Sequence, residues 1–128
     1  MNQDQAYRNK LLSGWEETYK KGQLTFWILL SLKKEKLYIT GIKDFIDQES
    51  KGTIKCEDQS IYRSLRKYYD LEMVDYELKE GNKGPNRKYY YLTELGETLL
   101  EDFISRNIKL LYNKNLYDLI NTTKTKRL

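Results

Sequence analysis

The chain has 128 residues, with 23 Lys or Arg and 19 Asp or Glu, so its formal net charge is +4. A single domain is the simplest organisation at this length, because domains cluster near about 100 to 150 residues. The chain has no histidine and one cysteine, Cys56, which excludes intrachain disulfides, Cys/His zinc sites and histidine acid–base catalysis. We therefore expect no metal, no cofactor and no catalytic residues.

Residues 1–15 predict an N-terminal arm. The stretch 6–19 mixes apolar and charged residues around Gly14, which indicates a short helix that wraps a partner subunit. The first six residues are polar and lack Lys or Arg, so no secretory signal is expected. No apolar run approaches the roughly 18 residues of a membrane span. A cytoplasmic location and no membrane partner follow as expectations.

Two helices and a strand are predicted next. The first helix continues from Glu16 to a polar break at residues 33–36, with an apolar face at helical spacing: Leu24, Trp27, Ile28 and Leu32. The second helix spans residues 38–50, with Thr40 as its candidate N-cap and Gly52 as its stop. The β-branched residues of 53–55 then favour a short strand.

A third helix is predicted from about Gln59 to Tyr69, after Glu57 and Asp58, which supply a cap and a favourable negative charge. Its apolar residues share one side: Ile61, Leu65 and Tyr68. Basic and hydrogen-bonding side chains project elsewhere. One side of this helix is therefore core, and the other is exposed and basic.

A two-stranded hairpin with a basic tip follows. Residues 73–79 alternate in the manner of a strand, residues 80–85 carry turn-forming Gly, Asn and Pro, and residues 87–92 form a second strand rich in Tyr. Thr93 then caps a long helix, whose apolar stripe continues to Leu111 and resumes beyond a break at residues 113–115. This apolar surface exceeds what one small domain covers, which predicts a second chain.

The order of helix, helix, helix, hairpin and long helix is that of a winged helix-turn-helix protein. The expected fold class is mainly α with a small β-hairpin. We expect a DNA-binding domain over residues 16–92, a dimerisation helix over residues 93–121 and a basic tail over residues 122–128. A short helix with a basic face fits the major groove of B-DNA, about 12 Å wide, while a basic hairpin beside it reaches phosphates.

Two segments resemble the PadR-like transcriptional regulators. Residues 59–67, QSIYRSLRK, are similar to the family's recognition helix, with a hydroxyl residue, an apolar residue and Tyr before Leu and basic positions. Residues 84–96, GPNRKYYYLTELG, are similar to its wing motif of Gly, a basic pair, two Tyr, Leu-Thr, an acidic residue and Gly. The resemblance covers residues 23–106.

The resemblance implies a homodimer formed by the first helix and the long C-terminal helix. Such dimers usually repress transcription at a pseudo-palindromic operator in double-stranded DNA, and some respond to a small-molecule effector. The expected interface residues are Leu24, Trp27, Ile28, Leu99, Phe103, Ile104, Ile108 and Leu111. Trp15 and Trp27 are candidates for a ligand pocket, although packing in the core or interface is the stronger interpretation of a Trp on an apolar helical face.

The expected DNA contacts come from the third helix and the hairpin: Gln59, Ser60, Tyr62, Arg63, Arg66, Lys67, Lys83, Arg87 and Lys88. Arg63 is long enough for a bidentate pair with guanine, worth about 1 to 3 kcal/mol of discrimination, and Ser60 and Tyr62 can donate to phosphates. The competing interpretation is a solvated helix face and a solubilising hairpin tip, with Tyr62 packed beneath the hairpin. The adjacent hairpin favours DNA contact.

Two other functions stay open on the sequence alone. A winged-helix protein for plasmid replication or partition would use the same residues on repeated DNA sites. A winged-helix module for protein interaction would not need them at all. An enzyme is not expected, because no histidine, metal cluster or phosphate-binding glycine loop is present.

Overall fold

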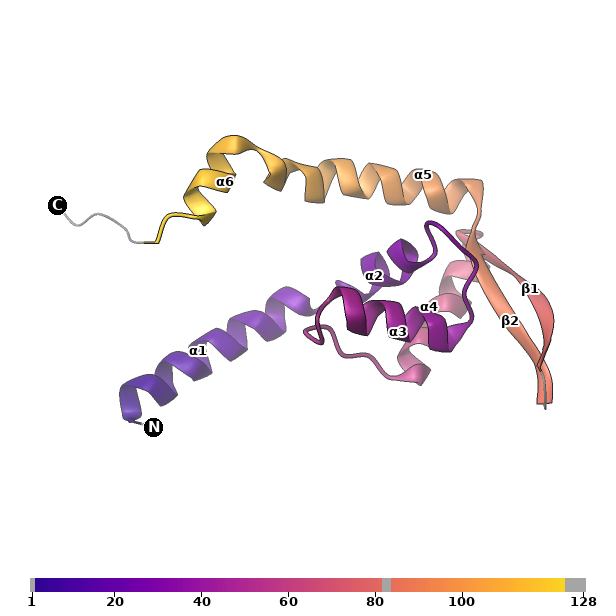
Figure 1. Ribbon diagram of the computed structural model, residues 1–128, viewed down its shortest axis with the longest axis horizontal. Coiled ribbons are helices and arrows are strands. Elements are labelled where there is room, and N and C mark those ends of the chain that lie inside the picture. The colour runs from indigo at the N-terminus through magenta and orange to yellow at the C-terminus, as the bar shows by residue number, and fades with distance from the viewer. Residues whose placement is uncertain (1, 82–83, 124–128) are drawn as a thin grey trace.

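Figure 1 shows the computed structural model of the chain, which describes residues 2–81 and 84–123. Three short helices form the centre of the molecule, and an antiparallel hairpin lies at one side of them. Helix α1 and the C-terminal segment both extend away from this centre on the side opposite the hairpin. Across the described ranges, no helix combines the length and apolarity that crossing a membrane requires.

The core lies among helices α2 (Leu24–Ser31), α3 (Ile39–Glu49) and α4 (Asp58–Asp70). Helices α3 and α4 each contribute an apolar stripe at helical spacing, as the sequence predicts, whereas α2 is apolar most of the way round. The fully buried side chains include Ile28, Ile42, Ile46, Ile61 and Leu65. Removing such aliphatic side chains from water supplies about 1.5 to 3 kcal/mol each, which fixes the faces that the helices turn inward.

Helix α1 (Gln3–Lys20) differs from the prediction. The expected boundary after residue 15 lies inside this helix, which continues unbroken past Glu16. Gly14 has nothing near its Cβ position and stays helical, whereas Gly22 adopts a φ of +91° that ends the helical path. The break between the first two helices therefore lies at residues 21–23, and α1 buries none of its side chains.

The ends of α3 agree only partly with the prediction. Tyr38 occupies the N-cap without a side-chain cap bond, so Thr40 is not the cap; its hydroxyl donates instead to the Tyr38 hydroxyl at 2.8 Å. Gly52 is the stop that was predicted, with a φ of +74° and its N–H donating to the Asp47 carbonyl at 2.8 Å.

The strand predicted over residues 53–55 is wrong, because this segment is a loop between α3 and α4. Its β-branched Ile54 is buried in the core without pairing as a strand. The backbone of Leu37 pairs with Tyr90 instead, through two hydrogen bonds of 3.0 and 2.8 Å. The hairpin is thereby fastened to the segment before α3.

The hairpin consists of β1 (Val74–Gly81) and β2 (Gly84–Leu92), paired antiparallel with Tyr76 opposite Tyr90. Its face toward the helices buries Val74, Tyr90 and Leu92 near the base. Further out on the same face, Leu78 is 58% exposed. The hairpin therefore begins in the core and projects beyond it (Figure 1).

Thr93 caps α5 (Glu94–Phe103) as predicted, because its hydroxyl accepts from the Gly96 N–H at 3.1 Å. The long helix that the sequence predicts to Leu111 is present as a continuous helical path over residues 94–112, but only its first part is α-helical. A π-helical turn (Ile104–Ile108) and a 3-10 turn (Lys109–Tyr112) follow α5. The break predicted near residue 113 is confirmed, since the Asn113 side chain accepts from the Asn115 N–H and caps α6 (Lys114–Ile120).

Candidate nucleic-acid interface

Helix α4 presents a polar face to solvent. Ile61, Leu65 and Tyr68 are buried on its inner side, and the Tyr68 hydroxyl donates to the Thr25 hydroxyl of α2 at 2.6 Å. The residues on the other side are exposed: Gln59, Tyr62, Arg63, Arg66 and Lys67. The division follows from helical periodicity, which separates the apolar stripe from the basic one.

A groove of about 840 Å³ lies between α4 and the hairpin. Its walls contain five tyrosines, Tyr38, Tyr62, Tyr69, Tyr76 and Tyr90, and three cations, Arg66, Arg87 and Lys88. Tyr62 lines the groove and is 50% exposed. Tyrosine hydroxyls and basic groups are the donors that phosphate oxygens accept from.

Two cations of the hairpin lie over tyrosine rings of the same groove. The Arg87 guanidinium carbon is 4.7 Å from the centroid of the Tyr38 ring, and the Lys88 Nζ is 4.6 Å from that of Tyr76. Such contacts are worth about 0.5 to 1 kcal/mol at exposed sites. The rings therefore restrict where these two long side chains can place their charge.

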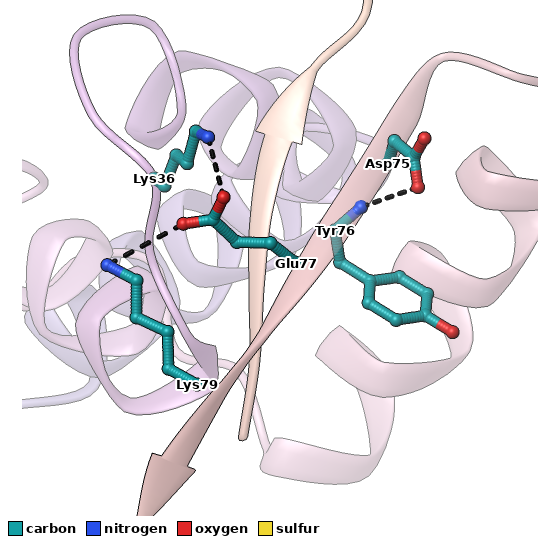
Figure 2. A network of polar contacts seen from close by, with 5 residues as sticks. All are labelled: Lys36, Asp75, Tyr76, Glu77 and Lys79. Carbon is teal, nitrogen blue, oxygen red and sulfur yellow. Dashed lines mark hydrogen bonds and ion pairs between the residues drawn. The ribbon is translucent and has the colours of Figure 1, made fainter. Parts of the chain in front are cut away.

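The opposite face of the hairpin pairs its charges internally, as Figure 2 shows. The Glu77 carboxylate forms ion pairs with two lysines: Lys36 Nζ lies 2.9 Å and Lys79 Nζ 3.7 Å from its oxygens. Tyr76 projects to the other side of the hairpin. The hydrogen bond from Lys36 lowers the pKa of Glu77, and the same bond raises the pKa of Lys36. The charges of Lys36 and Lys79 are thus offset by a carboxylate. Arg87, opposite Lys79 in the strand register, projects from this same face, whereas Lys88 projects from the face of Tyr76, and both line the groove.

The predicted DNA contacts fall into separate places. Tyr62, Arg66, Arg87 and Lys88 meet at the groove, and Gln59, Arg63 and Lys67 lie on the exposed face of α4 beside it. Ser60 lies apart from the groove and lines a second hollow. Lys83 lies outside the described residues.

Sequence reasoning missed the tyrosines that build the groove: Tyr38, Tyr69, Tyr76 and Tyr90. The sequence does hold a signal for Tyr69, the one of these four that lies in α4: it follows Tyr62 by seven residues, so the two share a helical face. The contributions of Tyr38 and Tyr76 depend on how α3 and the hairpin pack against α4. No local pattern reveals that packing.

The predicted interface residues are mostly accessible. Leu99, Phe103 and Leu111 are exposed, and four others are partly buried: Leu24, Trp27, Ile104 and Ile108. Ile28 differs from the prediction, because it is 0% exposed in the core of its own chain and has no surface to offer a partner. Phe103 stacks on Phe26 with ring centroids 5.5 Å apart, which packs α5 against α2.

The two tryptophans do not share a pocket in this chain. Trp15 is 73% exposed on α1, whereas Trp27 packs edge-on against Phe26 with ring centroids 6.0 Å apart. The indole N–H of Trp27 is buried without a hydrogen-bond partner among the described residues. Neither the groove nor the hollow that Ser60 lines includes either side chain.

The model of the transcriptional regulator PadR-like family matches residues 28–102, which span the core helices, the hairpin and most of α5. The chain belongs to this family. PadR-like proteins are transcriptional regulators, which agrees with the expectation that the chain is not an enzyme. No curated protein sequence gives a significant match.

Solved PadR-like structures share the fold. A PadR-like transcription factor from bacteroid fragilis has a TM-score of 0.61 and 27% identity over 84% of this chain and 96% of its own. A family member from Eggerthella lenta reaches a TM-score of 0.70 at 20% identity, over 93% and 99% of the two chains. Bacillus subtilis PadR in complex with operator DNA has a TM-score of 0.59 and 25% identity, over 63% of this chain and 47% of its own.

These matches confirm the predicted fold class and family. In the PadR-like winged-helix fold of this chain, the hairpin β1–β2 is the wing and α4 is the helix that precedes it. Of the two segments that resemble the family, residues 59–67 lie in α4, and residues 84–96 cover β2 and the first turn of α5.

Proposed function

We propose that this PadR-like protein is a homodimeric, sequence-specific regulator that binds double-stranded DNA through α4 and the wing. The observation that carries the proposal is the continuity of two surfaces. Arg66 lies on the exposed face of α4 and also lines the groove that Arg87 and Lys88 line from the wing. A helix in the major groove would therefore bring its flanking phosphates to the groove cations.

The proposed contacts differ in what they read. Arg63 lies on the exposed face of α4 and would pair with a guanine edge, which discriminates among bases. Tyr62, Arg66, Arg87 and Lys88 line the groove and would donate to phosphates, which position the protein without reading sequence. The solved operator complex of Bacillus subtilis PadR, at 25% identity, supports this assignment of partner.

Exposed apolar side chains support the homodimer. Helix α1 exposes Tyr7, Leu11, Leu12, Trp15 and Tyr19, and the C-terminal segment exposes Leu99, Phe103, Leu110, Leu111, Leu119 and Ile120. Surfaces of this kind mark association sites, since monomers rarely leave large apolar patches in water. Two copies related by a twofold axis would present two recognition helices, which suits a pseudo-palindromic operator.

Repression, a cytoplasmic location and a response to a small molecule complete the proposal. A bound repressor needs no surface beyond the DNA-binding one to block transcription. An effector would act through the proposed subunit interface, where Trp15 is exposed on α1. Operator affinity with and without candidate effectors measures that response.

The test compares Arg63→Ala with Arg87→Ala in DNA selected from a random library by the wild-type protein. Arg63→Ala is expected to cost about 1 to 3 kcal/mol on the selected site and to relax preference at one base position. Arg87→Ala is expected to weaken binding to all DNA sequences alike. It should also reduce the slope of log affinity against log salt concentration, the salt slope, by about 0.9 for each phosphate that is no longer neutralised. Lys34→Ala, an exposed lysine between α2 and α3, is the control.

Other outcomes identify the other functions. Enrichment of iterated sites would favour plasmid replication or partition. If the wild-type dimer enriches no DNA sequence, and both arginine variants keep their biological activity, the chain is a protein-interaction module instead.

A further inference from the structure

A second hollow, of about 700 Å³, lies where the end of α1, the start of α2 and the α3–α4 loop meet the first turn of α4. Its lining includes Lys20 and Lys21 from the end of α1, Lys55 from the loop, and Ser60 from α4. In Figure 1 the end of α1 lies away from the hairpin, with the α3–α4 loop beneath the core helices. The proposed wing contacts use none of these residues.

The two hollows flank the same exposed face of α4. Residues of an α-helix are spaced about 100° apart around its axis, so Ser60 and Tyr62 are separated by about 160°. Ser60 lines the second hollow, whereas Tyr62 and Arg66 line the groove at the wing. The exposed Gln59, Arg63 and Lys67 lie between these two flanks, opposite the buried stripe of Ile61 and Leu65.

Duplex DNA offers a phosphate backbone on each side of an inserted helix. The major groove is about 12 Å wide, and an α-helix with its side chains measures about 10 to 12 Å across, so both backbones lie next to the helix. If one backbone meets the groove at the wing, the other faces the opposite flank of α4. That flank holds the second hollow.

The charge of the second hollow suits a phosphate. Lys20, Lys21 and Lys55 outnumber the two carboxylates of its lining, Glu17 and Glu57. Among the residues that the structure describes, no ion pair involves any of these three lysines. Their ammonium groups are therefore available to a polyanion, and the Ser60 hydroxyl is a further donor at the same place.

We infer that the hollow formed by Lys20, Lys21, Lys55 and Ser60 binds phosphates of the second DNA strand, on the side of α4 opposite the wing. The inference rests on the proposed function and extends it. It assigns a DNA contact to the α1–α2 junction, which joins the arm to the DNA-binding domain. Contacts on both flanks would hold α4 centred in the major groove.

Two double variants test the site with equal changes of net charge. Lys20→Ala/Lys21→Ala removes the adjacent pair at the end of α1, and Lys33→Ala/Lys34→Ala removes an exposed adjacent pair after α2 that lines neither hollow. The probe is a fluorescent duplex of mixed sequence, about three helical turns long. Its affinity is measured by anisotropy across a series of salt concentrations, with thermal unfolding followed for each variant.

The Lys20/Lys21 variant is expected to lower the salt slope by about 0.9 for each phosphate that it leaves unneutralised, and so to weaken binding by roughly tenfold per phosphate near 0.1 M salt. The Lys33/Lys34 variant should keep the wild-type slope. Lys55→Ala, which lies in the loop on the other wall of the hollow, should lower the slope by the amount expected for one phosphate.

Equal reductions of the slope in both double variants would mean that net charge alone is responsible, and an unchanged slope in the Lys20/Lys21 variant would mean that the hollow meets no phosphate. Either result overturns the inference while leaving the proposed function standing, provided that Arg87→Ala still weakens binding. A wild-type protein that binds no duplex would overturn both.

Discussion

At the scale of single residues, Gly96 shows why the wing motif ends in glycine. A Cβ at this position would collide with the carbonyl oxygen of Met73, just before β1. The same corner is closed by Thr93, whose hydroxyl donates to the Glu72 carbonyl at 2.6 Å and accepts from the Gly96 N–H. The first turn of α5 thereby packs directly on the backbone at the base of the wing.

Gly96→Ala is therefore expected to destabilise the fold by about 1 to 3 kcal/mol, because backbone must shift to relieve the collision. Gly14→Ala is the matched control, since Gly14 is helical with nothing within 4 Å of its Cβ position. That change should stabilise α1 by about 0.5 to 1 kcal/mol. Urea unfolding measures the free energy of unfolding of both variants. Repeating it at several protein concentrations separates an effect on folding from an effect on association. Equal stability of the two variants would contradict the packing described for Gly96.

At the scale of elements, the base of the wing is packed in the core, and its outer part carries the proposed DNA contacts. Tyr90 is buried at the base, and burial raises the pKa of its hydroxyl. Along the same strand, Arg87 and Lys88 reach the groove, where Tyr38 and Tyr76 lie beneath them. Two similar pairs, Lys36 over Tyr91 and Lys79 over Tyr89, do not line the groove.

Tyr38 is expected to position Arg87 for phosphate contact. Tyr38→Leu removes the ring and should reduce both DNA affinity and the salt slope, whereas Tyr38→Phe keeps the ring and should preserve the slope. Tyr91→Leu, which removes a ring under Lys36 instead, should leave the slope unchanged. Salt-dependent anisotropy measures the slopes, and thermal unfolding separates an effect on positioning from an effect on stability. A reduced slope in the Phe variant would assign the role to the hydroxyl instead.

The elements that could be predicted from the sequence are those whose burial is periodic. Helix α4 and the hairpin follow directly from the stripe of Ile61 and Leu65 and from the alternation after Val74. The π-helical turn at Ile104–Ile108 could not be predicted, because its apolar residues continue a helical stripe. The groove was missed for another reason: its tyrosines come from α4, both strands and the residue that precedes α3.

At the scale of the whole molecule, the proposed DNA-binding surface and the proposed subunit interface are adjacent in the chain. Strand β2 ends at Leu92 and α5 begins at Glu94, so the Thr93 corner joins the two. A displacement of α5 would therefore act on the base of the wing through the contacts of Thr93 and Gly96. An effector that binds at the proposed subunit interface and displaces α5 would therefore move the wing and change the affinity for the operator.

Disrupting the proposed subunit interface is expected to abolish tight operator binding without unfolding the winged-helix domain. Leu99→Glu/Leu111→Glu places two charges on exposed apolar positions of the C-terminal segment, which should dissociate the dimer because each carboxylate would have to be buried there. Separated protomers bind half-sites independently, so operator affinity should fall by about 10² to 10⁴.

Leu71→Glu is the control, because Leu71 is similarly exposed but lies at the end of α4. Sedimentation velocity measures the oligomeric state of both proteins, and anisotropy on the selected operator measures affinity. The control should remain dimeric. A double variant that also remains dimeric would locate the interface away from the C-terminal segment, leaving the exposed apolar face of α1 as the surface through which two protomers associate.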